Sequence, residues 1–233
     1  MPTIDTLLPD MMRVLEEANR GEGAPALKPE AQEFFDKAMA DILKKGLQGK
    51  GGKRVRTPKT LYISEIGHPC HRKLWFKVRP ELFTAVDING KALFKFLYGD
   101  IIEALVLTLA IQAGHEVTHY QHPIEFEVKD GWKIRGRLDA VIDGVLIDVK
   151  SASSMSMKKF HDIGKLIGDD QFGYIMQLLT YWSNLEGVSS ETGFLAVDKT
   201  DGTMVLPLLS PGGALPSHIY EHLVGVAESS KMP

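Results

Sequence analysis

One stretch, from Trp132 to Ser151, constrains the fold of this chain more than any other segment. Apolar and polar side chains alternate on both sides of Asp143-Gly144, and Asp-Gly between alternating strands is the strongest short signal for a β-hairpin. A two-residue turn fixes the register of the two strands and predicts that Asp139 faces Asp148. The stretch therefore predicts a β-sheet that brings two carboxylates together.

The predicted hairpin has one apolar face and one charged face. Because side chains alternate along a strand, Ile147 and Val149 point to the core, while Asp148 and Lys150 emerge together beside Asp139. Like charges that face each other destabilise a strand pair by roughly 0.2–1 kcal/mol, so a cation is expected between the two carboxylates. A hard divalent ion such as magnesium prefers carboxylate oxygens.

Four short motifs resemble the signature of the PD-(D/E)XK nuclease superfamily, in its RecB-like and phage-exonuclease branch. Gly136-Arg-Leu-Asp139 and Ile147-Asp-Val-Lys150 are similar to the core motif, Gly99-Asp-Ile-Ile-Glu103 to the upstream metal-ligand motif, and Gln177-Leu-Leu-Thr-Tyr181 to the downstream Gln-x-x-x-Tyr motif. Each motif alone is common, whereas four in the expected order form a stronger signal. The RecB branch often has histidine at the position of Glu103, and phage exonucleases also use a carboxylate there.

The resemblance implies a magnesium-dependent deoxyribonuclease, with manganese as a substitute metal, that hydrolyses phosphodiester bonds. The first expectation is an exonuclease acting on DNA ends in phage-type recombination, repair or host DNA degradation. A structure-specific or nicking endonuclease of the same fold is one alternative, and a non-catalytic DNA-binding protein is an alternative of another class. The implied catalytic residues are Glu103, Asp139, Asp148, Lys150, Gln177 and Tyr181. The implied metal ligands are Glu103, Asp139, Asp148 and the main-chain carbonyl of Val149.

The order of the elements predicts an α/β (α+β) fold with a mixed central β-sheet flanked by helices. The resemblance implies a restriction-endonuclease-like core with an N-terminal helical extension. Apolar periodicity predicts helices at residues 4–18, 30–43, 92–113, 155–162, 170–185 and 217–228, and strands at 117–128 and 193–197. Residues 1–60 are expected to form N-terminal helices and a basic, glycine-rich arm, and residues 61–233 the nuclease domain.

Composition fits a nuclease with one compact domain. The 233 residues, 44% of them hydrophobic, suffice for a sizeable core. The sequence contains neither a run of about 18 apolar residues nor a signal-peptide pattern, so a cytoplasmic protein without a membrane partner is expected. The single Cys70 excludes an internal disulfide and a four-cysteine iron-sulfur cluster.

The net charge of −3 argues mildly against a nucleic-acid-binding protein, but the charge is unevenly distributed. Between Lys44 and Lys59, seven basic residues lie among four glycines without an acidic residue. This arm is expected to clamp a phosphate backbone, with a solvated linker as the alternative. The residues expected to contact DNA are Lys53, Arg54, Arg56, Arg72, Lys73, Lys158 and Lys159. DNA is thus the expected partner, and a single-strand-binding or annealing protein is a second candidate.

Glu103 has a structural alternative, and the chemical role of Lys150 is narrowed by its neighbours. Asp100 and Glu103 have the spacing of a capping box at a helix start; the neighbouring hairpin favours Glu103 as a metal ligand and leaves the cap to Asp100. Lys150, beside carboxylates and metal, is expected to act as a charged group rather than as the sole general base. On the helix of residues 170–185, Gln177 and Tyr181 are expected to hold this lysine or a phosphate.

A few further residues are assigned to structure rather than to chemistry. Tyr174 lies on the same helical stripe as the Gln-x-x-x-Tyr motif and is assigned to the core. His68, Cys70 and His71 suggest zinc, but no second pair of ligands follows them at a useful spacing. Structural or incidental roles are therefore favoured for these three.

Overall fold

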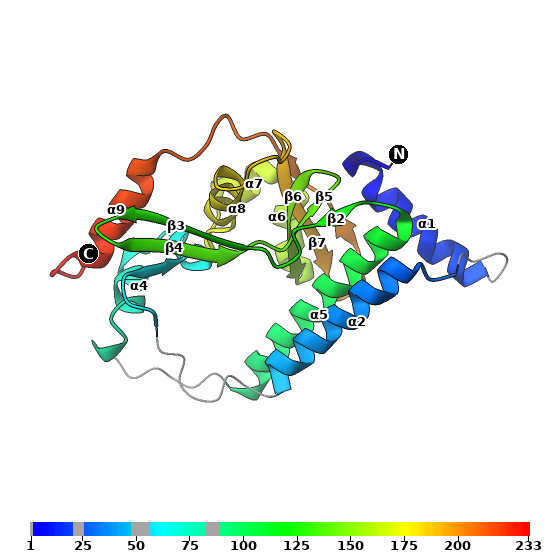
Figure 1. Ribbon diagram of the computed structural model, residues 1–233, viewed down its shortest axis with the longest axis horizontal. Helices are drawn as coiled ribbons and strands as arrows, with labels where there is room; N and C mark the ends of the chain where they lie inside the picture. Colours follow the sequence, from blue (N-terminus) through cyan, green and yellow to red (C-terminus); the bar gives the residue numbers. More distant parts are fainter. Residues whose placement is uncertain (1, 21–25, 48–55, 83–88) are drawn as a thin grey trace.

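The computed structural model describes residues 2–20, 26–47, 56–82 and 89–233. It has a mixed α/β fold in which helices flank two β-sheets (Figure 1). Within the described residues, the smaller sheet has three strands in the order β1 (Thr60–Tyr62), β4 (Trp132–Arg137) and β3 (Pro123–Lys129). The larger sheet has six, in the order β2 (Val117–Thr118), β5 (Ala140–Ile142), β6 (Val145–Ala152), β7 (Thr192–Asp198) and β8 (Met204–Val205), with β9 (Leu208–Leu209) also paired to β7.

The hairpin predicted from the sequence is present, and its turn has the predicted length. Ile142 faces Val145, so Asp143 and Gly144 alone connect β5 to β6. Both turn residues have positive φ values, 49° and 81°, as a type I′ turn requires. The predicted register is therefore confirmed over the whole of β5.

The ladder ends sooner than predicted. Its last pair is Ala140 with Ile147, so the prediction that Asp139 and Asp148 face each other as a strand pair is wrong. The strand predicted to begin at Trp132 is broken after β4, and the chain passes from the smaller sheet into the larger one before β5. The single central sheet predicted from the sequence is accordingly replaced by two sheets.

The strand predicted at residues 117–128 is divided in the same way. Its two parts are β2 and β3, which belong to different sheets. Between them, His119 and Gln121 have positive φ values of 55° and 50°, a conformation that turns the chain and that few non-glycine residues adopt. The chain therefore crosses between the sheets at this bend as well as after β4.

Two helices from the N-terminal part of the chain, α1 (Leu7–Arg20) and α5 (Gly90–Ala113), pack on one face of the larger sheet, with the 3-10 helix η1 (Ile4–Thr6) before α1. Helix α2 (Pro29–Leu47) packs mainly on α5. Leu7 and Met11 of α1 share a core with Ile147 and Val149 of β6, as the predicted strand alternation requires. Helix α2 lies alongside α5 over much of its length (Figure 1).

A second core joins the two sheets. It contains Leu61 of β1, Ile134 of β4, Leu146 of β6 and Phe194 of β7, so each sheet contributes to it. The remaining helices are α3 (Ile63–Ile66), α4 (His71–Lys77), α6 (Ser154–Phe160), α7 (Ile163–Gly168), α8 (Tyr174–Ser183) and α9 (Ser217–Glu228), with the 3-10 helix η2 (Pro80–Leu82). None of the described helices has both the length and the apolar character needed to cross a membrane.

The start of α8 depends on a close contact between two glycines, which yields a test of the fold. Gly173 has φ 78°, and a Cβ there would lie 2.2 Å from the carbonyl carbon of Gly67. Gly187 has φ 76°, but no described atom lies within 4 Å of a Cβ at that position. Gly187→Ala should therefore cost about 1–2 kcal/mol of unfolding free energy, for the left-handed backbone alone.

Gly173→Ala should cost clearly more, on the order of 3 kcal/mol or above, because the backbone of Gly67 must also move. Urea unfolding of the two variants and the wild type measures both losses. Equal losses in the two variants would show that the contact between Gly67 and Gly173 does not constrain α8.

Candidate active site

A cleft with a volume of about 1090 Å³ opens where residues of both sheets meet helices α5 and α8. Its lining includes five of the six catalytic residues proposed from the sequence, namely Glu103, Asp139, Lys150, Gln177 and Tyr181. The sixth, Asp148, is only 2% exposed and lies beneath the cleft, in ion-pair contact with Lys150. Residues that are far apart in the sequence therefore converge on one site.

Glu103 lies in the interior of α5, where no helix cap is needed. The helix starts at Gly90, and Asn89 caps it by accepting a hydrogen bond from the amide of Ala92 at 3.0 Å. The capping role predicted for Asp100 is therefore wrong, and Asp100 instead lines the cleft. The alternative explanation of Glu103 as part of a capping box is removed.

The carboxylate of Glu103 is held in a dehydrated position. The side-chain amide of Gln121 donates a hydrogen bond to Glu103 Oε1 at 2.8 Å. The pKa of Glu103 is raised to about 7, chiefly by burial and also by the nearby carboxylates of Asp100 and Asp148, while the Gln121 hydrogen bond and Lys150 oppose the rise. Glu103 thus lies close enough to the hairpin carboxylates for their charges to affect its pKa.

Asp139 stands where the chain leaves the smaller sheet, immediately before β5. Its Oδ2 accepts a hydrogen bond from the amide of Val149 at 2.8 Å. Burial raises the pKa of Asp139 well above its usual value, and repulsion from Asp148 and Glu103 adds to this effect. The two aspartates therefore interact as predicted, although they are not partners in the ladder. At Val149 the contact that the structure shows is made by the amide, whereas the sequence suggested the carbonyl as a metal ligand.

Asp148 and Lys150 form a buried ion pair between Oδ2 and Nζ. The other carboxylate oxygen, Oδ1, accepts a hydrogen bond from the side-chain amide of Gln177 at 3.4 Å. Burial raises the pKa of Asp148, and Lys150 partly offsets the rise. Burial alone would lower the pKa of Lys150, but the carboxylates of Asp148 and Asp139 outweigh it and the net shift is upward. Lys150 therefore stays protonated, as expected for an electrostatic group.

The motif on α8 is close to the site, and its predicted contact with a phosphate stays a prediction. Gln177 contacts the carboxylate of Asp148 rather than the lysine. Tyr181 approaches the hairpin motif: a Cβ at Gly136 would lie 2.6 Å from the Tyr181 hydroxyl oxygen, so a side chain at that position would displace it. Burial raises the pKa of Tyr181, and its hydroxyl stays neutral. The glycine of the motif is thus explained by close approach.

Two residues of the site are missed by the sequence-based reasoning. The side-chain amide of Gln121 positions Glu103, and the backbone amide of Gln121 donates to the carbonyl of Asp139 at 3.0 Å. It reaches both because of the bend at His119 and Gln121, for which the strand pattern gives no signal. Tyr174, assigned to the core, also has its ring 5.0 Å from Lys150 Nζ, in a cation–π contact.

The basic residues proposed to contact DNA have different environments. Lys53 and Arg54 lie outside the described residues. Arg56 is engaged within the fold: its guanidinium donates to the carbonyl of Thr60 at 2.7 Å and pairs with Glu65 at 2.9 Å, and its side chain is 14% exposed. Arg56 therefore makes these contacts within the fold, and its phosphate contact stays a prediction.

The other four proposed DNA contacts are nearer to solvent. Arg72 on α4 is exposed and donates to the carbonyl of Pro233 at 3.3 Å. Lys73 borders a pocket that Gln177 also lines. Lys158 is exposed, and Lys159 pairs with Asp169 at 2.6 Å in a pocket that Lys150 also lines. Lys73 and Lys159 are thus placed beside the cleft.

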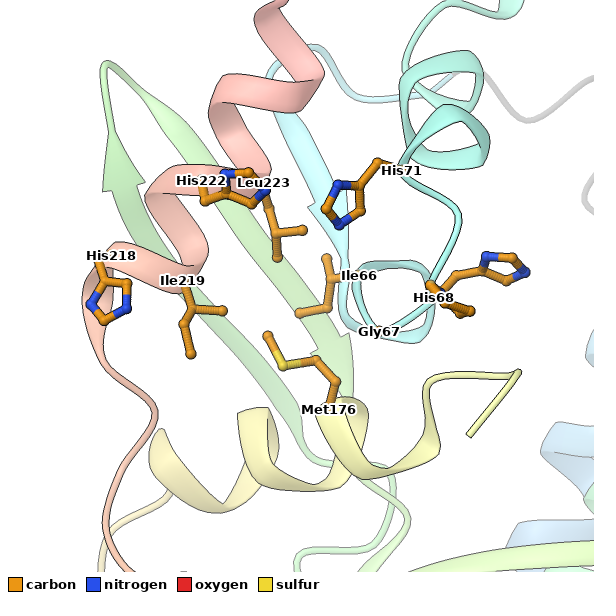
Figure 2. Close-up of a pocket in the computed structure, with 10 residues that line it drawn as sticks. Ile66, Gly67, His68, His71, Met176, His218, Ile219, His222 and Leu223 are labelled. Atoms are coloured by element: carbon orange, nitrogen blue, oxygen red, sulfur yellow. The ribbon is translucent and has the colours of Figure 1, made fainter. Parts of the chain in front are cut away.

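A separate pocket of about 410 Å³ contains four of the histidines (Figure 2). His218 and His222 of α9 line this pocket together with His68 and His71, a second pair that the sequence spacing did not reveal. Figure 2 shows His71 and His222 side by side, with ring centroids 5.2 Å apart, whereas His68 and His218 point away from the pocket. Two rings that face each other do not complete a zinc site, which takes four ligands.

Among the described residues, no three His, Cys, Asp or Glu side chains form a ready group for a metal ion. At the cleft, Asp139 is hydrogen-bonded to Val149 and Asp148 is paired with Lys150, so these carboxylates make contacts within the protein. The donor set nevertheless fits a hard divalent cation, because the buried carboxylate of Asp148 and the partly buried carboxylates of Glu103 and Asp139 lie together. Lys150 is the one lysine of the cleft lining among the described residues. Binding would exchange these contacts for coordination.

The raised pKa of Glu103 gives a pH-dependent prediction for the metal-free protein. Between its ordinary value of 4.5 and about 7, the folded state retains a proton that the unfolded chain has lost. The corresponding stability is complete below about pH 4.5 and is lost as the pH rises through about 7. Glu103→Gln, which cannot ionise, should match the wild type near pH 4.5 and exceed it at pH 8 by up to about 3 kcal/mol. Urea unfolding in EDTA at both pH values checks this, and a pH-independent difference would contradict it.

The two aspartates should respond in opposite ways to loss of charge. In Asp139→Asn the amide oxygen still accepts from Val149 while repulsion by Asp148 disappears, so the variant should gain on the order of 1 kcal/mol, or about 2–4 °C in melting temperature. Asp148→Asn removes the ion-pair partner of a buried ammonium and should lose about 3–5 kcal/mol. Thermal melts in EDTA at pH 8 separate them; a gain in Asp148→Asn with a loss in Asp139→Asn would reverse the assignment of partners.

Comparisons with known proteins do not assign this chain to a family. No protein-family model matches it, and no curated protein matches it. Among solved structures, the crystal structure of SSO0001 is similar over 87% of this chain and 89% of that chain, with 16% sequence identity and a TM-score of 0.47. A likeness at this level carries no argument about fold or function, so the functional conclusion depends on the residues of the cleft.

Proposed function

We propose that this chain is a metal-dependent deoxyribonuclease with a restriction-endonuclease-like core, acting in the cytoplasm on phosphodiester bonds. The observation that carries the proposal is the convergence of Glu103, Asp139, Asp148 and Lys150 at one cleft. They come from α5, from the residue before β5 and from β6, so a short sequence coincidence does not account for their proximity. Three carboxylates and one ammonium suit the chemistry of phosphate hydrolysis.

Magnesium, or manganese in its place, is the proposed cofactor, with one or two ions per site. The ligands would be the carboxylates of Glu103, Asp139 and Asp148 and the carbonyl of Val149. The cation would polarise a phosphoryl oxygen and lower the pKa of a water molecule. Gln121 orients Glu103, and Gln177 orients Asp148, so each of these two carboxylates has a neighbouring amide that fixes its position.

The role of Lys150 follows from its protonation. In the metal-free protein the carboxylates keep its pKa raised, so the side chain is an ammonium and the proton of the attacking water would pass to solvent. Its ammonium instead stabilises the negative charge that develops on the phosphate as the water oxygen bonds to phosphorus and the bond to the leaving oxygen breaks. Tyr174, whose ring contacts the ammonium, helps to hold Lys150 in place for this role.

Among nucleases, an exonuclease acting on DNA ends is the first candidate, because the motifs resemble the RecB-like and phage-exonuclease branch. A structure-specific or nicking endonuclease is the second candidate, because the same residues would serve both. A DNA-binding protein without activity would gain nothing from burying Asp148 against Lys150 beneath a cleft, since desolvating an ion pair costs energy. DNA is the proposed partner, together with a single-strand-binding or annealing protein if the products enter recombination.

Incubation with DNA of different topology tests the proposal. Linear and circular DNA, single- and double-stranded, are incubated with magnesium or with EDTA. Loss of linear DNA alone indicates an exonuclease, and nicked or linearised circles indicate an endonuclease. Glu103→Gln should fold and lose the magnesium-dependent cleavage, because the metal site loses a negative ligand. Intact DNA in every reaction of the wild type would contradict the proposed activity.

A change at Lys150 separates transition-state stabilisation from metal binding. Lys150→Gln should lower kcat by about 10²–10³-fold, as the loss of one preorganised electrostatic group does. Stabilisation of the variant by magnesium should persist, because the carboxylates remain. Lys37→Gln, at an exposed lysine of α2, is the control and should behave as the wild type. Unchanged kcat in Lys150→Gln would exclude the assigned role.

A further inference from the structure

Three aromatic rings form a stack that runs from the core to the surface beside Lys150. Phe160 of α6 is 3% exposed and stacks on Tyr174 with a centroid distance of 6.1 Å and an interplanar angle of 28°. Phe172 also stacks on Tyr174, at 5.3 Å and 19°, and is 63% exposed. The proposed catalytic ammonium lies 5.0 Å from the centroid of Tyr174. The exposed end of the stack is thus one ring away from the proposed reaction centre.

The backbone that carries Phe172 is firmly held. The carboxylate of Asp170 accepts hydrogen bonds from the amides of Gly173 and Tyr174, each at 2.9 Å, and from that of Ile175 at 2.8 Å. Gly173 also packs directly on the backbone of Gly67. An exposed phenylalanine on a fixed turn can offer its ring to a ligand without a large loss of conformational entropy.

Phe172 and Tyr174 stand between two pockets, and each pocket shares a residue with the active-site cleft. The first pocket, of about 340 Å³, is also lined by Lys150. The second, of about 260 Å³, is also lined by Gln177. The basic residues of the two pockets are Lys150, Lys159 and Lys199 in the first and Lys73 and Lys77 in the second. The exposed ring is therefore flanked by positive charge on both sides.

Part of this charge is neutralised within the protein. Lys159 pairs with Asp169 at 2.6 Å and Lys77 with Glu65 at 3.4 Å. Neither Lys73 nor Lys199 forms an ion pair within 4.0 Å in the described part of the chain, although the charge of Lys199 acts on Asp198, so each pocket keeps one ammonium outside such a pair. An apolar ring between two ammonium groups is complementary to a polyanion with flat apolar faces. A single nucleic-acid strand has this chemistry: phosphates alternate with bases that stack on aromatic side chains.

We propose that the cleft takes a single-stranded DNA segment, one base of which stacks on Phe172 while the neighbouring phosphates contact Lys73 and Lys199. This inference rests on the proposed nuclease function and specifies its substrate. A base inside a duplex has both faces covered by its neighbours, so it can extend the stack of Phe172 only when it is unpaired. The phosphate next to the stacked base is then brought towards Lys150, which borders both the first pocket and the cleft.

Binding in EDTA tests this inference without cleavage. Fluorescence anisotropy with a labelled single-stranded oligonucleotide gives Kd, and quenching of 2-aminopurine in the same strand reports stacking of a base. Phe172→Ala should weaken binding by about 5- to 150-fold, the usual effect of losing one stacked base, and should remove the quenching. Phe172→Trp should retain both. Blunt duplex DNA should bind the wild type more weakly than the single strand does.

Phe94→Ala is the matched control, since Phe94 on α5 is 69% exposed and does not border the two pockets or the cleft. Equal single-strand affinity of the two alanine variants, or stronger binding of the blunt duplex, would overturn the inference. Cleavage by the wild type in magnesium is measured separately. Cleavage with no effect of Phe172→Ala on binding would refute the stacking site alone, and Phe172-dependent binding without any cleavage would refute the nuclease alone.

Discussion

The ion pair between Asp148 and Lys150 is the interaction on which the rest of the site depends. Both residues lie on β6 at positions paired with β7, and water has little access to Asp148, which is buried, whereas Lys150 reaches the cleft. Removing two charges from water costs several kcal/mol per ion, and their mutual attraction returns this cost only with good geometry and further hydrogen bonds. Here Gln177 provides one such bond to Asp148, and Tyr174 provides a polarisable surface for Lys150.

Two more carboxylates make the same region unfavourable for the metal-free protein. Glu103 and Asp139 have raised pKa values because they are buried, and because they repel each other and Asp148. A core designed for stability alone would place apolar residues here, as it does on the other face of β6 with Ile147 and Val149. The concentration of dehydrated acids in a cleft is the physical basis for proposing chemistry at this site.

The sequence predicts local features of this site better than its long-range geometry. The hairpin turn is determined by the two residues Asp143 and Gly144, and the length of α9 by apolar periodicity, so both are predicted correctly. The breaks that divide the predicted strands are different, because they depend on how two sheets pack. Neither the bend at Gln121 nor the end of the ladder at Ala140 changes the apolar pattern, and therefore the pattern does not indicate the second sheet.

The same break explains how Asp139 reaches the site. If the ladder continued past Ala140, the side chain of Asp139 would stand beside Asp148 and its backbone would pair with β6. Because the chain turns into the smaller sheet, the Asp139 carboxylate instead replaces a backbone acceptor and takes the amide of Val149. The backbone amide of Val149, which has no partner on β5, thus donates to a side chain instead. The Asp139 carboxylate is thereby fixed near Asp148 and Glu103. A continuous strand pair would also bring Asp139 to Asp148, but only by placing the two charges directly opposite each other.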